Sequence, residues 1–297
     1  MLLAVHYVLP PEWRWYILGY FILAGLAGGT YTLGMLLRLW GRPWDEPAAR
    51  LSFLLAFPLT LACPVLLTID LGQPLRFWHM MADTGVAGPG LNFMYWSPMS
   101  LGVWGLLVFG VFATVSFLEV VARDGRYRYP GSQLVARVLG GTAGRVVNVV
   151  GTVFALFLAG YTGVLLSVSN QPVWSDTYAL GGLFLASGLS GAAALLILCA
   201  PLRTGADASE DALGDADGFF ALLEVAFLVV LFATLGFAGQ LTRAVGAPWF
   251  VLWAIVVLSL LPPLGGRFAG RLTVGPGGTA AMTAVRVSAA ATAVLVL

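Results

Sequence analysis

Long apolar stretches constrain this chain more than any other feature of its sequence. Each is close to the ~20 residues that an α-helix needs to cross the hydrocarbon core of a bilayer. They lie at residues 15–38, 48–71, 98–121, 145–168, 178–200, 219–240, 247–264 and 274–297. Only 10% of the residues are charged, against about 25% in a typical soluble domain. The sequence therefore predicts an all-α integral membrane protein, a single polytopic domain over residues 1–297 with about eight spanning helices in two four-helix bundles.

Basic residues are distributed unequally between the two sides of the predicted membrane domain. The loops of one side hold Arg38, Arg42, Arg50, Arg123, Arg126, Arg128, Arg137, Arg145, Arg203, Arg267 and Arg271. The loops of the other side hold only Arg14, Arg76 and Arg243. Because cytoplasmic loops carry an excess of basic residues, we expect a multi-pass protein of a bacterial inner membrane, with the first set in the cytoplasm and both termini outside.

Metal-ligating residues are few. A haem held by two histidines needs both ligands within the helix bundle, whereas His6 and His79 both lie outside the apolar stretches. Cys63 and Cys199 lie in separate apolar runs without a CxxC spacing. We therefore expect no haem, iron–sulfur cluster or other metal in this chain. The net charge of +1 gives no indication of nucleic-acid binding.

A first concentration of polar side chains follows the second apolar stretch, on the outer side. Asp70, Gln73, Arg76 and His79 lie within ten residues of one another. Such groups supply the hydrogen bonds and the proton exchange that a quinone headgroup requires. The alternative interpretation is a polar interfacial loop in which Asp70 and Arg76 form a structural ion pair.

A second concentration of polar residues begins at Tyr161 and includes Asn170 and Asp176. Tyr161 lies about seven residues, or ~10 Å, below the outer end of its helix, and Tyr20 lies at a similar depth in the first helix. Two phenols and a carboxylate are therefore expected to meet in the outer third of the membrane. Taken singly, each tyrosine also fits an interfacial aromatic belt.

Two carboxylates, Glu119 and Glu224, fall within apolar stretches toward the cytoplasmic side. Ionisable groups inside a membrane are costly and usually functional. We predict proton transfer by Glu119 and Glu224, together with Asp70 at the outer side. The alternative for Glu224 is an ion pair with an arginine at the inner surface.

Three stretches taken together resemble the NrfD-like family, the membrane subunits of polysulfide reductase and related complexes. The first is AGLAGG at residues 24–29. The second is DLGQPLRFW at 70–78, followed by SPMSLGVW at 97–104. The third is YTGVLLS at 161–167, leading into NQPVW at 170–174. The glycine-rich stretch alone would carry little weight, but the combination is specific.

The resemblance implies a haem-free, eight-helix subunit that binds menaquinone or ubiquinone near its outer face. It implies that Tyr161 contacts the quinone. Tyr20 falls where polysulfide-reductase-type relatives place a quinone-contacting histidine, and Ile17 falls where they place an asparagine. A tyrosine still donates a hydrogen bond to a quinone carbonyl, but unlike histidine it does not take up a proton at neutral pH.

The resemblance also implies an iron–sulfur, ferredoxin-like partner, often joined to a molybdopterin catalytic subunit, in a respiratory oxidoreductase complex. We expect Trp78, Trp174 and Asp176 to help to dock that partner. The expected quinone-binding residues are Tyr20, Asp70, Gln73, Arg76, His79, Tyr161 and Asn170. The alternatives are a secondary transporter or proton-conducting protein, which Glu224 and Arg286 would suit, and a purely structural anchor.

Overall fold

The computed structural model describes residues 13–84, 90–125, 130–247 and 249–268. Six helices in this part of the chain are long and apolar enough to cross a membrane. They are α1 (Trp15–Trp40), α2 (Glu46–Asp70), α3 (Pro98–Asp124), α5 (Thr142–Ser167), α6 (Leu180–Cys199) and α7 (Glu210–Phe237). The shorter apolar helix α9 (Phe250–Phe268) falls on the seventh predicted stretch. The all-α membrane class is thus confirmed, whereas the eighth stretch, 274–297, lies outside the described residues.

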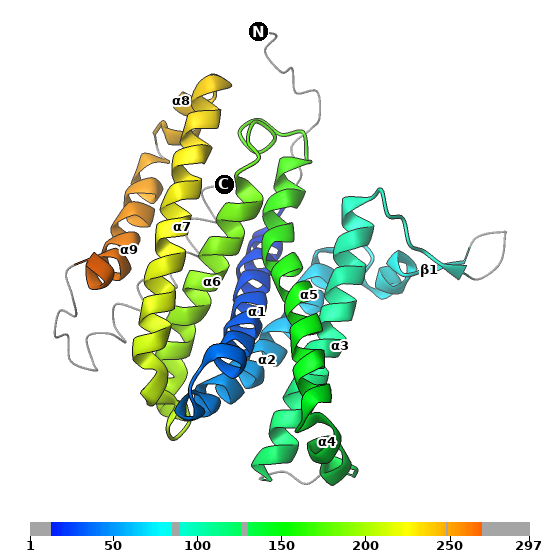
Figure 1. The fold of residues 1–297 in the computed structure, drawn as a ribbon. Helices are drawn as coiled ribbons and strands as arrows, with labels where there is room; N and C mark the ends of the chain where they lie inside the picture. The colour runs from blue at the N-terminus through cyan, green and yellow to red at the C-terminus, as the bar shows by residue number, and fades with distance from the viewer. Residues whose placement is uncertain (1–12, 85–89, 126–129, 248, 269–297) are drawn as a thin grey trace.

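Short elements occupy the two ends of the long helices. One end carries the 3₁₀ helix η2 (Pro74–Met80) and an antiparallel pair of short strands, β1 (Ala82–Asp83) and β2 (Gly90–Leu91). We call this end the hairpin end. Helix α8 (Leu241–Val245) connects α7 to α9 at the top of Figure 1. The other end carries η1 (Pro43–Asp45), α4 (Ser132–Leu139), η3 (Ala200–Leu202) and η4 (Ala206–Ser209).

Helix α1 is the central element of the fold. It packs against α2, α5 and α6, while α3 closes a four-helix group by packing against α2 and α5. The second group continues from α6 through α7 to α9 (Figure 1). Glycines let the backbones approach closely: a Cβ at Gly28 would collide with the carbonyl of Ala155 on α5, and one at Gly29 with the carbonyl of Gly188 on α6.

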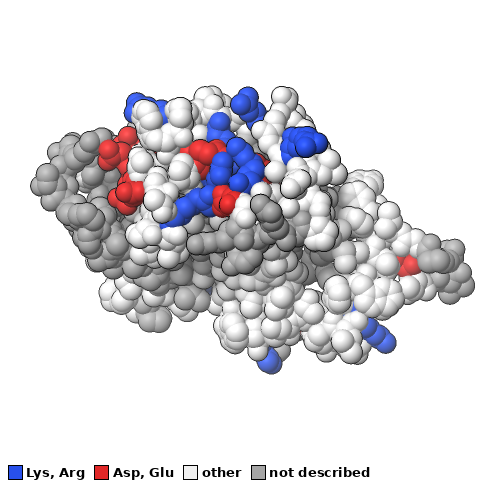
Figure 2. Space-filling model, turned by 90° about the horizontal axis from the view of Figure 1, so that it is seen from below, with Lys and Arg blue, Asp and Glu red and all other residues white. Residues whose placement is uncertain are grey.

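Charged side chains gather at the end of the fold where α1 finishes and α2 begins, which we call the basic end. Figure 2 shows this face, with basic and acidic side chains side by side over the helix ends. Arg38, Arg50, Arg123 and Arg203 lie there with Glu46, Glu119 and Asp124. Four of the arginines that the sequence assigns to one side of the membrane therefore meet at one end of the molecule; Arg126, Arg128 and Arg271 of that set lie outside the described residues.

Candidate functional site

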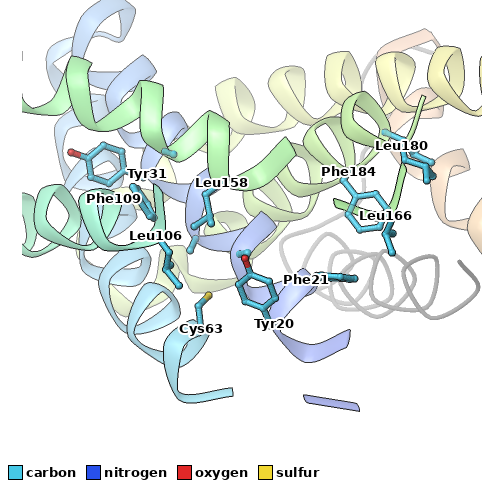
Figure 3. Close-up of a cluster of buried hydrophobic side chains, with 14 of the residues drawn as sticks. Tyr20, Phe21, Tyr31, Cys63, Leu106, Phe109, Leu158, Leu166, Leu180 and Phe184 are labelled. Atoms are coloured by element: carbon cyan, nitrogen blue, oxygen red, sulfur yellow. The ribbon is translucent and has the colours of Figure 1, made fainter. Parts of the chain in front are cut away.

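Tyr20 places a phenol in the core between the helices. Its side chain is only 3% exposed, and it lies within electrostatic range of Cys63 on α2 and Tyr161 on α5. Figure 3 shows the Cys63 thiol beside the Tyr20 ring. Within the described part of the chain, no residue forms a hydrogen bond with the Tyr20 hydroxyl. Because this hydroxyl forms no hydrogen bond within the described residues, it is a candidate for contact with a ligand.

Tyr161 comes close to Tyr20, as the sequence predicts, but its hydroxyl already has a partner. It donates a hydrogen bond of 2.7 Å to the carbonyl oxygen of Pro98, at the start of α3. The ring stacks on Phe157, with centroids 5.4 Å apart, and a Cβ at Gly102 would collide with it. Tyr161 is thus held rigidly between α3 and α5, with lone pairs of its oxygen available to accept a second hydrogen bond.

Asp70 and its polar neighbours lie at the hairpin end, where α2 finishes. Asp70 is half-buried, Gln73 and Arg76 are exposed, and the described residues form no ion pair between Asp70 and Arg76. The structural ion pair considered as an alternative is therefore not seen. The His79 ring stacks on Trp78, 3.7 Å between centroids, and its Nδ1 lies 3.2 Å from the Arg76 carbonyl. Seven residues separate Asp70 from Cys63, which is about 10 Å along the helix.

A broad apolar surface surrounds these residues at the hairpin end. We call it the hairpin surface; its exposed members are Leu75, Phe77, Trp78, Leu91, Phe93, Met94, Tyr95 and Trp96. Leu75 is 88% exposed and Leu91 is 79% exposed, and the strands that carry part of this surface project away from the helices (Figure 1). Contiguous apolar surface of this kind marks an interaction site. Trp78 belongs to it.

The other two expected docking residues, Trp174 and Asp176, have contacts within the chain. Trp174 is half-buried and stacks on Trp13, with centroids 5.4 Å apart. Asp176 accepts a hydrogen bond of 3.0 Å from the backbone N–H of Val173. Val173 has φ +73° and the exposed Asn170 has φ +54°, and a left-handed conformation is rare for a β-branched residue. Trp174 and Asp176 therefore help to hold a strained turn between α5 and α6.

Glu119 is fixed by arginines at the basic end. Its carboxylate accepts hydrogen bonds from Arg38 at 2.8 Å and from Arg123 at 3.0 Å, and its side chain is 2% exposed. Glu46, Arg50, Asp124 and Arg203 extend these contacts through further ion pairs. We call these seven residues the arginine clamp. The structure thus shows ion pairs with arginine for Glu119. The sequence suggests such a pair for Glu224 instead.

Glu224 has a different environment, in the interface between α6 and α7. It is 6% exposed, and its carboxyl group is hydrogen-bonded by Ser187. Two helical turns away, the buried Asp217 accepts a hydrogen bond of 2.7 Å from Ser190. Within the described residues no arginine forms an ion pair with Glu224. Asp217 and both serines were not predicted from the sequence, although the seven-residue spacing of the two carboxylates indicates a shared helix face.

A second buried polar group, also missed, joins α1, α3 and α5. The Tyr31 hydroxyl lies 2.8 Å from the Ser116 hydroxyl, which donates a 2.8 Å hydrogen bond to Asn148 Oδ1. Gly151 leaves room for this arrangement, because a Cβ there would collide with the Tyr31 hydroxyl. Figure 3 shows Tyr31 separated from Tyr20 by Phe109, Leu106 and Leu158. This group therefore cross-links helices at a distance from the Tyr20 site.

The described residues contain no group of three or more His, Cys, Asp or Glu side chains placed to hold a metal ion. The family profile described as polysulphide reductase, NrfD, matches residues 9–262. The chain belongs to the NrfD polysulphide reductase family. The match covers every long helix that carries the sites above, and it confirms the resemblance seen in the sequence.

Similar proteins agree with the NrfD assignment. The C subunit of polysulfide reductase from Wolinella succinogenes is 29% identical over 243 residues, which cover 78% of this chain and 73% of that protein. An NrfD homolog of Haemophilus influenzae is 27% identical over 283 residues, covering 85% and 82%. Protein NrfD of Escherichia coli is 26% identical over 204 residues, covering 64% and 60%. The similarity thus extends over most of the membrane domain.

Proposed function

We propose that this NrfD-family chain is the quinone-binding membrane anchor of a respiratory oxidoreductase complex. It would pass electrons between menaquinone or ubiquinone and an iron–sulfur partner subunit, with the terminal catalytic site on a further, molybdopterin-containing subunit. The observation that carries the proposal is Tyr20, whose side chain is buried near Tyr161 and whose hydroxyl has no described hydrogen-bond partner.

The surroundings of Tyr20 fit a quinone headgroup. Such sites combine apolar and aromatic walls with a few well-placed polar groups, and here the stacked rings of Tyr161 and Phe157 lie next to a single available phenol. A bound quinone would supply a carrier of two electrons and two protons. Tyr20 would donate a hydrogen bond to one carbonyl oxygen, and Tyr161 would hold the headgroup in place.

Asp70 is our candidate for proton exchange at the hairpin end. It is half-buried and has no described hydrogen-bond partner, so its carboxylate is available to take a proton and release it to water. Gln73, Arg76, His79 and Asn170 would line the same entrance. We further propose that the hairpin end faces the outside of a bacterial inner membrane, because the arginines lie at the opposite end.

The hairpin surface is our proposed docking site for the iron–sulfur subunit. Its exposed aromatic side chains have the composition of a protein interface, and they lie at the same end of the molecule as Asp70. Electrons would then travel only from a quinone in the outer third of the membrane to a partner bound at the hairpin end. Trp78 would contact the partner, whereas Trp174 and Asp176 would support the neighbouring turn.

Tyr20→Phe tests the quinone site. With quinol below saturation, we expect turnover of the purified complex to fall about fivefold, since one hydrogen bond contributes about 1 kcal/mol. Tyr31→Phe is the matched control: it removes another buried phenol hydroxyl from α1, but one hydrogen-bonded to Ser116, and it should leave turnover unchanged. Asp70→Asn should also slow turnover while the complex still assembles. Wild-type rates in Tyr20→Phe and Asp70→Asn would contradict the assignment.

Proton conduction is the second candidate, and the α6–α7 interface favours it. Glu224 is a buried carboxyl group hydrogen-bonded to a serine, an environment in which a proton can be held or released without breaking an ion pair. Glu119, in contrast, could take up a proton only by giving up its ion pairs with Arg38 and Arg123. Of the two carboxylates that the sequence suggests for proton transfer at the basic end, we therefore propose Glu224.

A further inference from the structure

Helix α4 presents an exposed face that is divided lengthwise into two stripes. It has eight residues and packs against α3 and α5 at the basic end. Leu134 is 62% exposed and Val138, one turn later, is 51% exposed. Gln133 and Arg137 form an exposed polar stripe beside them. A helix with an apolar and a polar stripe side by side is suited to lie in the plane of a membrane surface.

Helix α5, against which α4 packs, carries an exposed row of its own. Arg145, Val149, Val153 and Phe157 follow one another at intervals of four residues, so they share a helix face. The last three are 44%, 62% and 39% exposed, as expected for side chains that contact lipid. Arg145 stands at the start of this row, on the turn nearest the basic end. An arginine in this position extends toward the headgroups while its stem covers apolar surface.

Arg137 and Arg145 differ from the arginines of the arginine clamp in having no described carboxylate partner. Both are exposed, and neither forms an ion pair with any carboxylate in the part of the chain that the structure describes. Figure 2 shows that several basic side chains of this face lie apart from the acidic ones. Two cations on packed helices that also expose apolar side chains match the chemistry of a phospholipid with an anionic headgroup.

We propose that α4 and the first turns of α5 bind an anionic phospholipid of the surrounding bilayer. Arg137 and Arg145 contact its phosphate, and the side chains of Leu134 and Val138 insert at the level of the headgroups. An acyl chain lies along Val149 and Val153. A protein partner would have to cover the α5 row as well, inside the hydrocarbon core, and for that reason we favour lipid. This inference does not depend on the quinone proposal.

Native mass spectrometry of the purified protein tests this site by titration with phosphatidylglycerol and, separately, phosphatidylcholine. The variants are Arg137→Gln, Arg145→Gln and the double variant, all at exposed positions that leave the fold intact, as the helical circular dichroism should show. Arg42→Gln is the matched control: it removes another exposed arginine at the basic end, one whose guanidinium lies over Trp44.

Each substitution at the site should weaken phosphatidylglycerol binding about fivefold, since one basic residue near a membrane contributes about 1 kcal/mol. Arg42→Gln should bind like the wild type, and phosphatidylcholine should not distinguish the proteins. Equal phosphatidylglycerol binding by the double variant and the wild type would overturn the proposal, as would an equal loss in Arg42→Gln. Loss of a co-purifying protein from the double variant, with lipid binding unchanged, would assign the surface to a protein partner instead.

Discussion

Two buried carboxylates of this protein show how differently one charged group can be accommodated in a membrane domain. Glu119, on α3, is 2% exposed and is held by Arg38 and Arg123. Glu224, on α7, is 6% exposed and is hydrogen-bonded by Ser187. The first belongs to a network that joins α1, α2, α3 and the segment after α6. The second lies in the interface of only two helices.

The difference separates structural carboxylates from those that can change protonation state. Protonating Glu119 would take from its two arginines their shortest carboxylate contacts and leave each, among the described carboxylates, with only Glu46 at 3.5 Å, which is unfavourable for a buried ion pair. Glu224 can gain or lose a proton while Ser187 turns its hydroxyl to donate or to accept. Burial alone therefore does not indicate function in this protein; the partner of each carboxylate does.

Glu119→Gln should have the largest effect on stability. It leaves Arg38, whose side chain is 9% exposed, without its nearest carboxylate, and removing one partner of a buried ion pair costs about 3–5 kcal/mol. Glu46→Gln, at a side chain that is 31% exposed, should cost about 1 kcal/mol or less. Thermal unfolding in detergent measures both. Equal costs for the two variants would contradict the structural role of Glu119.

Gly151→Ala should have an intermediate effect. The added methyl group would collide with the Tyr31 hydroxyl and force apart the hydrogen-bonded group at α1, α3 and α5. Such overpacking costs about 1–3 kcal/mol. Gly214→Ala, on α7, is the control, because a Cβ there meets nothing within 4 Å and alanine is favoured over glycine in a helix by about 1 kcal/mol. A stabilising effect of Gly151→Ala would contradict the close packing of α5 on Tyr31.

Glu224→Gln should have the smallest effect on stability, less than about 1 kcal/mol, because the amide still forms a hydrogen bond with Ser187. If Glu224 carries protons, the same substitution should abolish proton transfer across proteoliposomes that contain the purified complex, as reported by an internal pH-sensitive dye. A loss of stability as large as that of Glu119→Gln would instead place Glu224 among the structural carboxylates. Unchanged proton transfer would exclude it from the path.

The helices themselves were largely predictable, because apolar stretches of spanning length leave the backbone few alternatives. The predicted 98–121 and 145–168, for example, correspond to Pro98–Asp124 and Thr142–Ser167. The start of α7 was not predicted correctly, because the helix begins at Glu210, nine residues before the predicted residue 219. The acidic residues in that segment suggest a loop, but Asp217 is buried against Ser190 of α6, a contact that hydropathy does not reveal.

The candidate site was predictable only in part. The depth of each tyrosine along its helix was sufficient to place Tyr20 near Tyr161. The partners of the acidic residues were not predictable, since they depend on which helices are neighbours and on how each is rotated. Arg38 and Glu119 are 81 residues apart in the chain, and no local pattern joins them. Hydrogen bonding between Tyr161 and Pro98 was missed for the same reason.

The close packing of Gly28 on Ala155 and of Gly29 on Gly188 has a consequence for biogenesis. Helix α1 precedes the other spanning helices in the chain and leaves the ribosome before them, but the helices that cover its glycine face, α5 and α6, are synthesised more than a hundred residues later. During that interval this face has only lipid or the insertion machinery as a neighbour. Helix α1 is thus inserted early, but its packing is completed only when α5 and α6 have been made. A substitution at either glycine would therefore impair assembly of the helices before it affected any reaction.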